Sequence, residues 1–113
     1  MKSNRPSIHI VIGNFLSDPS GSRVIGGVET YIAELVRVLM LDGFQTNLYQ
    51  FAPSPFCVQW EGARVNGITD PHRRTHTLVR AAEDAGDPRR DILIFATDYL
   101  LTKHCFARAI AVQ

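Results

Sequence analysis

The strongest pattern of apolar and polar positions in the chain is helical and begins at Val28. From there, apolar residues recur at spacings of four, three, one and three, which places them on one face of a helix. The residues of this face are Val28, Ile32, Leu35, Val36 and Leu39. Glu29 in the first turn suits the positive end of a helix, and Gly43 suits a left-handed backbone stop at the other end. We therefore predict a helix that begins at Val28 and ends before Gly43.

Shorter apolar runs predict strands around this helix. Ile8–Ile12 form a short apolar run that ends at Gly13, which is typical of a strand covered on both faces. Residues 45–51 alternate polar and apolar positions, and residues 92–97 form a second buried run. A further strand begins within residues 109–113.

The remaining segments are interpreted from their turn residues. After the second strand, the signals are weak: a turn-like Pro-Ser-Pro-Phe and a short edge strand interrupted at Gly67. Asp70 and Pro71 suit the N-cap and the first position of a helix, which we predict to continue to about Ala85. Its inward face would hold Leu78, Val79, Ala82 and Ala85. The sequence pattern over residues 99–108 predicts a short helix.

Strands alternate with helices along the chain, and this order is typical of an α/β fold. It predicts a Rossmann-like open parallel sheet with helices on both faces. The right-handed crossover rule favours the strand order 3-2-1-4-5. We expect residues 1–113 to form one domain, because 113 residues are enough for one core. Since no helix follows the last apolar run, we expect the chain to be the front of a longer protein.

Composition and charge argue against several classes of partner. The net charge is +1 and the basic residues are scattered, so no basic stripe suits a nucleic-acid backbone. No run reaches the roughly 18 to 20 apolar residues that span a bilayer, and the N-terminus lacks a signal-peptide core. We therefore expect a cytoplasmic protein. Cys57 and Cys105 stand outside any metal-binding spacing, and we expect reduced, buried thiols.

Gly26 and Gly27 directly precede the predicted helix, at the end of a long loop over residues 14–27. In open parallel sheets, ligands bind beyond the carboxyl ends of the strands, where this loop lies. A helix N-terminus carries unpaired N–H groups and a partial positive charge, and glycine lets a phosphate approach them. Spacing alone favours the alternative, in which the two glycines form only a tight turn into the helix.

Other chemical motifs are missing from the sequence or incomplete. The residues after the first strand, Gly-Asn-Phe-Leu-Ser-Asp, differ from the dinucleotide fingerprint, and there is no P-loop, so we predict no cofactor. His72 and His76 lie four residues apart on a predicted helix but lack a third ligand, so we predict no metal site. We expect no thiol nucleophile at Cys105 beside His104, because helical neighbours point about 100° apart.

A strand, a long loop with Gly26, Gly27 and Glu29, and a helix follow one another in this chain. This arrangement resembles the N-terminal domain of retaining glycosyltransferases of the GT-B fold, in the large family-four group. The three residues match the family's G-G-x-E loop, residues 42–44 match its turn before the second strand, and residues 91–97 are similar to a later strand. The likeness covers most of the chain, and its most specific part is G-G-x-E.

The resemblance implies a two-domain enzyme that transfers a sugar from a nucleotide sugar to a glycan or lipid-linked acceptor. The loop of Gly26 and Gly27 would close over the donor phosphates, and Glu29 would brace it. This domain would hold the acceptor, and the missing C-terminal domain would supply most donor contacts. We expect the chain alone to be inactive and to associate with itself through apolar surface. A lipid-linked acceptor leaves open a peripheral position at the inner face of the membrane.

Thr97, Asp98 and Tyr99 follow a predicted buried strand at its carboxyl end. Capping of the next helix explains Asp98 by itself. The alternative is that these three residues bind acceptor hydroxyl groups, because ligands occupy this edge of the sheet. A second function stays open for the whole chain: a stand-alone flavodoxin-like binding or regulatory module without catalysis.

Overall fold

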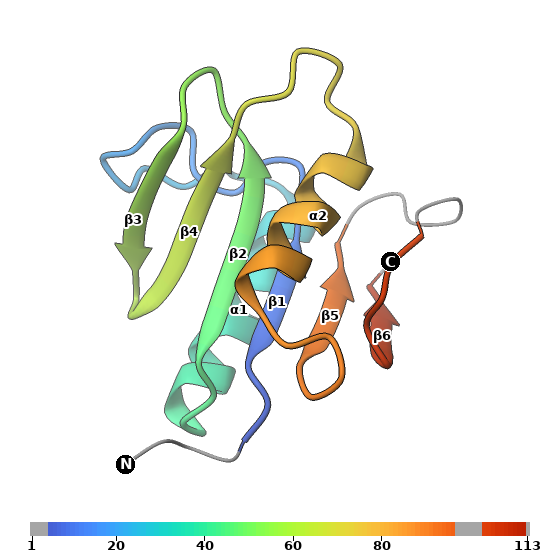
Figure 1. Ribbon diagram of the computed structural model, residues 1–113. Helices are drawn as coiled ribbons and strands as arrows, with labels where there is room; N and C mark the ends of the chain where they lie inside the picture. Colours follow the sequence, from blue (N-terminus) through green and yellow to red (C-terminus); the bar gives the residue numbers. More distant parts are fainter. Residues whose placement is uncertain (1–4, 97–102, 113) are drawn as a thin grey trace.

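The computed structural model describes residues 5–96 and 103–112, which form one six-stranded sheet with a helix on each face. The strands are β1 (Ile8–Val11), β2 (Thr46–Phe51), β3 (Phe56–Trp60), β4 (Ala63–Ile68), β5 (Ile92–Phe95) and β6 (Arg108–Ala111). The helices are α1 (Gly27–Leu41) and α2 (Thr75–Ala85). Figure 1 shows α1 behind the sheet and α2 in front of it.

The strand order is β3-β4-β2-β1-β5-β6. Every neighbouring pair is parallel except β3 and β4. Without β3, the five parallel strands follow the predicted order 3-2-1-4-5. The α/β class and the helices on both faces are therefore confirmed (Figure 1), and the sheet is consistent with a Rossmann-like fold. The incompleteness of the fold stays a prediction.

Side chains of the central strands point alternately to the two faces and divide the core into two clusters. The cluster on the α1 face includes Ile32, Ala33, Val36, Ile8, Ile10 and Leu48. The cluster on the α2 face includes Leu78, Val79, Ala82, Val11, Tyr49 and Leu93. Burying one large aliphatic side chain contributes about 1.5 to 3 kcal/mol relative to leaving it exposed. These clusters therefore hold both helices on the sheet.

Helix α1 ends where the sequence predicts. Gly43 has a φ of 85°, and its N–H donates to the Met40 carbonyl at 3.1 Å. The N–H of Phe44 donates to the Leu39 carbonyl at 2.9 Å. Together these bonds form a Schellman motif, which needs a left-handed residue at the glycine position. Val28 is 41% exposed, so its place on the inward face is wrong. The other four residues of the predicted face pack in or against the cluster on the α1 face.

The weakly patterned segment after β2 is a β-hairpin of β3 and β4. Glu61 and Gly62 connect the strands with φ values of 51° and 88°, which is typical of a type I′ turn. Strand β4 lies between β3 and β2, so the prediction of an edge strand is wrong. Gly67 lies within β4 and does not interrupt it. The Phe56 ring of β3 lies 2.5 Å from where a Cβ at this position would be. The glycine thus makes room for an aromatic ring.

Helix α2 begins at Thr75, so the prediction that Asp70 caps it and Pro71 opens it is wrong. Asp70 closes a turn instead. Its carboxylate accepts from the backbone N–H of His72 at 3.0 Å and from that of Arg74 at 3.2 Å. These bonds hold the intervening residues outside the helix.

Two further predictions along the chain are wrong. Ala85 is exposed rather than inward. The described part of the predicted helix over 99–108 is not helical: residues 103–107 form no regular element, and Arg108 begins β6. Phe106 packs instead into the cluster on the α2 face. Of the helices within the described ranges, none has both the length and the apolar character to cross a bilayer.

Candidate functional site

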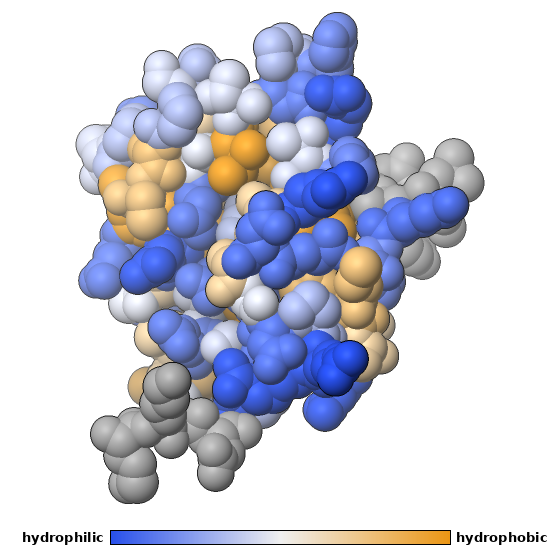
Figure 2. Space-filling model, in the orientation of Figure 1, coloured by the Kyte–Doolittle hydropathy of each residue, from blue (hydrophilic) through white to orange (hydrophobic). Residues whose placement is uncertain are grey.

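The loops that follow β1, β2 and β4 meet at the carboxyl edge of the sheet and surround a cavity of about 730 Å³, here called the edge cavity. It is lined by Asn14, Leu16, Ser17, Asp18, Pro19, Val24, Gln50, Phe51, Ala52, Pro53, Ser54, Phe56, Thr69, Asp70, Pro71 and Arg73. Figure 2 shows hydrophobic surface over the β3 side of the molecule and hydrophilic surface over α2. Open parallel sheets bind ligands at this edge.

One wall of the edge cavity is the loop over residues 14–26, which Gln50 ties to the sheet. Gln50 is buried in β2, accepts from the Leu16 N–H at 2.7 Å and donates to the Leu16 carbonyl at 3.0 Å. Leu16 also forms an antiparallel bridge with Arg23. The loop therefore has a fixed course although it contains no regular element.

Arg73 is the basic group of the edge cavity. Its guanidinium lies over the Phe51 ring, 4.8 Å from the centroid, and 3.3 Å from the side-chain oxygen of Asn14. Among the described residues, no carboxylate pairs with this guanidinium. Its φ of 48° lies in the left-handed region, which costs a residue with a side chain about 1 to 2 kcal/mol. The turn from Asp70 holds this backbone, since the Arg73 N–H donates to the Asp70 carbonyl at 2.9 Å.

Asp70 also lines the edge cavity, but its carboxylate is already paired. The side chain is 2% exposed and accepts from the Thr77 hydroxyl at 2.6 Å and from Arg74 Nε at 3.1 Å. The hydrogen bond from Thr77, followed by that from Arg74, holds the pKa of Asp70 well below its ordinary value. Asp70 is therefore ionised at neutral pH and shapes the loop rather than acting as a free base.

Gly26 and Gly27 lie at the same edge, at the start of α1, but outside the lining of the edge cavity. Gly26 is the N-cap residue of α1 and has no side-chain cap. The N–H groups of residues 27–29 have no hydrogen-bond partner among the described residues. A Cβ on Gly27 would meet nothing within 4 Å. The Glu29 carboxylate lies against Gly26 and makes no hydrogen bond to the described part of the chain, so its bracing role stays a prediction.

The predicted acceptor residues Thr97, Asp98 and Tyr99 lie outside the described residues. The structure thus brings the glycine loop to the expected edge and leaves this second group untested. Sequence reasoning missed Arg73, whose position depends on three loops meeting. The only sign of Arg73 in the sequence was the arginine pair at residues 73–74, directly after the turn that follows a strand.

Both histidines are exposed, but only His76 lies on a helix, and the cysteines differ from the predictions. His72 lies in the loop before α2 and His76 within α2, so they do not share a helix face. Cys57 and Cys105 are both exposed, so the prediction of buried thiols is wrong. A hydrogen bond to Glu83 raises the pKa of Cys105, which lowers the fraction of thiolate at neutral pH. Residues 5–96 and 103–112 contain no cluster of His, Cys, Asp and Glu that would hold a metal ion.

The carboxyl edge of the sheet thus carries two features suited to anions. One is the start of α1 with its unpaired amides, and the other is the guanidinium in the edge cavity. Comparisons of this chain with protein-family models, curated proteins and solved structures gave no significant match.

Proposed function

We propose that the chain is the acceptor-side domain of a retaining glycosyltransferase of the GT-B fold. The enzyme would transfer a sugar from a nucleotide sugar to a glycan or lipid-linked acceptor. One observation carries the proposal: Gly26 and Gly27 open α1 at the carboxyl edge of a parallel sheet of order 3-2-1-4-5, with the first amides unpaired among the described residues. Backbone amides at such a helix start are a general phosphate-binding arrangement.

In the proposed reaction, the N–H of Gly27 and its neighbours stabilises charge on the diphosphate leaving group. The glycosidic bond of the donor breaks as this charge develops, so fixed donors in place beforehand lower the barrier. Glycine at residue 27 adds no side-chain atoms beside these amides, and the space next to its Cα is open. A C-terminal domain would supply the remaining donor contacts, and this chain alone would not complete the transfer.

In the free chain, the Glu29 side chain lies at the start of α1. Its carboxylate lies against Gly26, where the positive end of the helix attracts negative charge. A donor phosphate would compete with this carboxylate, so in this proposal Glu29 moves aside when the donor binds, in place of the bracing role that the resemblance implies. The absence of hydrogen bonds from Glu29 to the described residues makes this movement inexpensive.

The test is a titration of the chain with UDP-glucose and GDP-mannose, followed by two-dimensional amide NMR spectra. We expect the largest shifts at residues 27–30, with dissociation constants of about 1 mM, because most donor contacts would lie elsewhere. In Gly27→Val, whose side chain meets no neighbour, binding should weaken at least about tenfold, since a charge-assisted hydrogen bond contributes about 1.5 to 3 kcal/mol.

The control variant is Tyr31→Val, which changes an exposed residue one turn further along α1. It should bind donors as the original chain does. Shifts that avoid the start of α1, or equal binding by Gly27→Val, would contradict the proposal. Donor binding without sugar transfer by the protein that carries this domain would favour the flavodoxin-like binding module.

A further inference from the structure

We propose that the edge cavity is a second binding site, for a small molecule with an apolar or aromatic body and one anionic group, a carboxylate or a phosphate. Arg73 would pair with the anion. The site is separate from the start of α1, because Gly26 and Gly27 do not line it. Its volume of about 730 Å³ lies within the range of small-molecule sites.

The lining of the cavity favours an apolar body. Half of the sixteen lining residues are aliphatic, proline or aromatic, and most of the lining surface is apolar; these residues are Leu16, Pro19, Val24, Phe51, Ala52, Pro53, Phe56 and Pro71. The side chains of two of its polar residues are already hydrogen-bonded within the protein. Gln50 is occupied by Leu16 and by the carbonyl of its neighbour in β2, and Asp70 is occupied by its own loop and Arg74. A ligand body would therefore meet mainly carbon.

Arg73 supplies a positive charge that the described residues leave uncompensated. Asp70, the nearest carboxylate in sequence, is turned toward Arg74 and Thr77 instead. The guanidinium is already fixed between the Phe51 ring and Asn14, so little side-chain freedom is lost when it binds an anion. Arg73 is exposed, so an anionic group reaches its guanidinium from solvent.

The backbone of Arg73 is a second sign of a functional position. Its φ of 48° is unfavourable for a residue with a side chain, and the turn closed by Asp70 maintains it. Strain of this kind persists where the surrounding structure fixes it, and it is concentrated at binding sites. Here it directs the guanidinium to the ring of Phe51 in the cavity wall.

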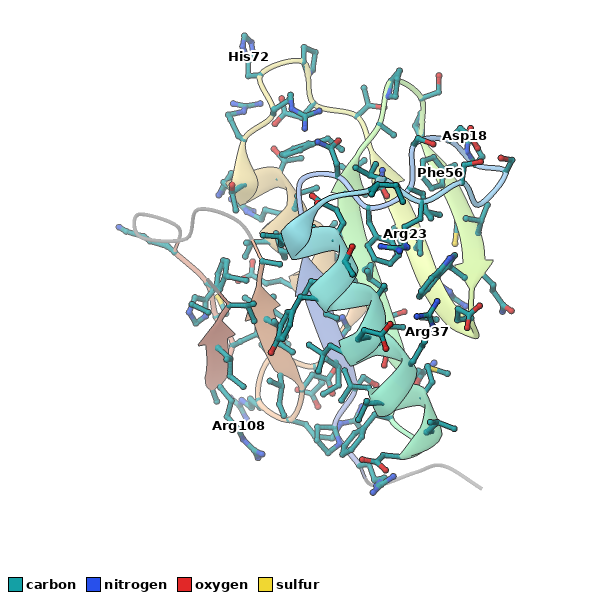
Figure 3. All side chains as sticks on the ribbon, turned by 180° about the vertical axis from the view of Figure 1, so that it is seen from behind. Asp18, Arg23, Arg37, Phe56, His72 and Arg108 are labelled. Atoms are coloured by element: carbon teal, nitrogen blue, oxygen red, sulfur yellow. The ribbon has the colours of Figure 1, made fainter. Side chains whose placement is uncertain are left out.

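Asp18 determines the orientation of the ligand. It lines the cavity beside Phe56 on the β3 side, whereas the loop that carries His72 and Arg73 lies on the opposite side (Figure 3). Hydrogen bonds from the Ser20 hydroxyl and N–H lower the pKa of Asp18, so it is ionised at neutral pH. Its charge repels an anion from the β3 side. The anionic group therefore lies at Arg73 and the body extends toward Phe56.

The test uses four probes that separate the charge from the body: phenyl phosphate, 3-phenylpropionate, neutral 3-phenylpropan-1-ol and inorganic phosphate. Binding is followed by amide NMR shifts of residues 13–18, 50–54 and 69–73. We expect the two aromatic anions to bind at least about tenfold more tightly than the neutral alcohol and inorganic phosphate, because only they use both parts of the site. The stronger of the two anions identifies a phosphate or a carboxylate as the natural group.

Two variants that each remove an arginine charge are compared, Arg73→Gln and the control Arg89→Gln. Arg73→Gln should weaken aromatic-anion binding at least about tenfold, and Arg73→Lys should recover part of it, because lysine keeps the charge but not the planar donor pair. Arg89→Gln removes an exposed charge between α2 and β5, at the opposite edge of the sheet, and should leave binding unchanged. Equal losses in both Gln variants, equal binding of the neutral alcohol, or no binding at about 10 mM would overturn the proposal.

Binding in the edge cavity does not depend on the proposed transfer reaction. Only a role of the bound molecule as the sugar acceptor would depend on that reaction. Gly27→Val should leave phenyl phosphate binding intact, and Arg73→Gln should leave UDP-glucose shifts at the start of α1 intact. Failure of one experiment therefore leaves the other informative. Displacement of phenyl phosphate by UDP-glucose would contradict the separation of the two sites.

Discussion

Acid should destabilise this fold through a buried carboxylate, Asp91, at the amino edge of the sheet. The side chain is 2% exposed and accepts hydrogen bonds from the Ser7 N–H at 2.9 Å and the Asp87 N–H at 2.9 Å. His9 Nε2 lies 2.8 Å from it and Arg90 Nε 3.2 Å. The carboxylate thus joins the segment before β1, strand β1 itself and the turn before β5.

The histidine in this cluster is held from both sides. A carboxylate only accepts hydrogen bonds, so His9 Nε2 donates to Asp91, and His9 Nδ1 lies 2.8 Å from the Tyr49 hydroxyl. Burial raises the pKa of Tyr49 well above its ordinary value, so the phenol stays protonated. Gly86 at the end of α2 closes the cluster, because a Cβ there would lie 2.7 Å from His9 Cε1.

The magnitude follows from the pKa of Asp91. Burial alone would raise this pKa, but the hydrogen bonds from Asp87, His9, Ser7 and Arg90 outweigh it and lower the pKa from 3.8 to about 2. One pKa unit corresponds to about 1.4 kcal/mol, so ionised Asp91 contributes about 2 kcal/mol to the free energy of unfolding. Because the pKa is lower in the folded state, this contribution is present above about pH 5. It declines as the pH falls through 3.8 and is lost near pH 2.

The assay is urea unfolding between pH 6 and pH 2, followed by the fluorescence of Trp60, the single tryptophan. Trp60 reports on folding because its ring packs edge-on against Phe15 at 5.0 Å. Asp91→Asn should be less stable at pH 6, and its difference from the original chain should shrink by about 2 kcal/mol between pH 5 and pH 2. Asp84→Asn, in an exposed position on α2, is the control. A difference between Asp91→Asn and the original chain that does not change with pH would refute the reasoning.

Two further predictions concern stability. Gln50→Ala should lower the free energy of unfolding by about 1 to 3 kcal/mol, because it leaves buried backbone groups of the loop unpaired. The control variant Gln59→Ala, at an exposed position of β3, should change the free energy of unfolding little. Urea titrations compare the two variants, and equal effects would contradict this prediction. Gly67→Ala should cost about 1 to 3 kcal/mol, because its Cβ would meet the Phe56 ring at 2.5 Å, whereas Gly27→Ala meets nothing. Thermal unfolding compares the two, and an unchanged midpoint for Gly67→Ala would count against this packing.

The elements that the sequence predicts well are those fixed by local pattern. Strand β1, helix α1 and strand β2 follow from two apolar runs, a helical spacing and Gly43, and all of these signals lie within the segments concerned. The order of the parallel strands follows because crossover connections have one hand. Local pattern and this rule were therefore sufficient for the layers of the fold.

The elements that the sequence predicts poorly depend on contacts between segments. Gly67 suggests a break in a strand until the Phe56 ring beside it is known. Asp70 followed by Pro71 has the form of a helix start, but the carboxylate is shared with Thr77 in a turn. Arg73 takes part in a site only because the loops after β1 and β2 reach it. In each case, the deciding partner lies on another loop, strand or helix.

Helix α1 shows how a strong helical pattern can misplace a residue at the margin of the inward face, as it does Val28. Besides the face on the sheet, it carries apolar residues that remain exposed: Val28 at 41%, Tyr31 at 54%, Val38 at 53% and Leu41 at 87%. Their spacing of three, seven and three places them on one side of the helix, so the helix has two apolar stripes. The predicted face matched the stripe on the sheet except at Val28, which belongs to the exposed stripe. The sheet selects the stripe that contains Ile32, Ala33 and Val36 because those residues fit against β1 and β2, and this fit is a property of the assembled layers.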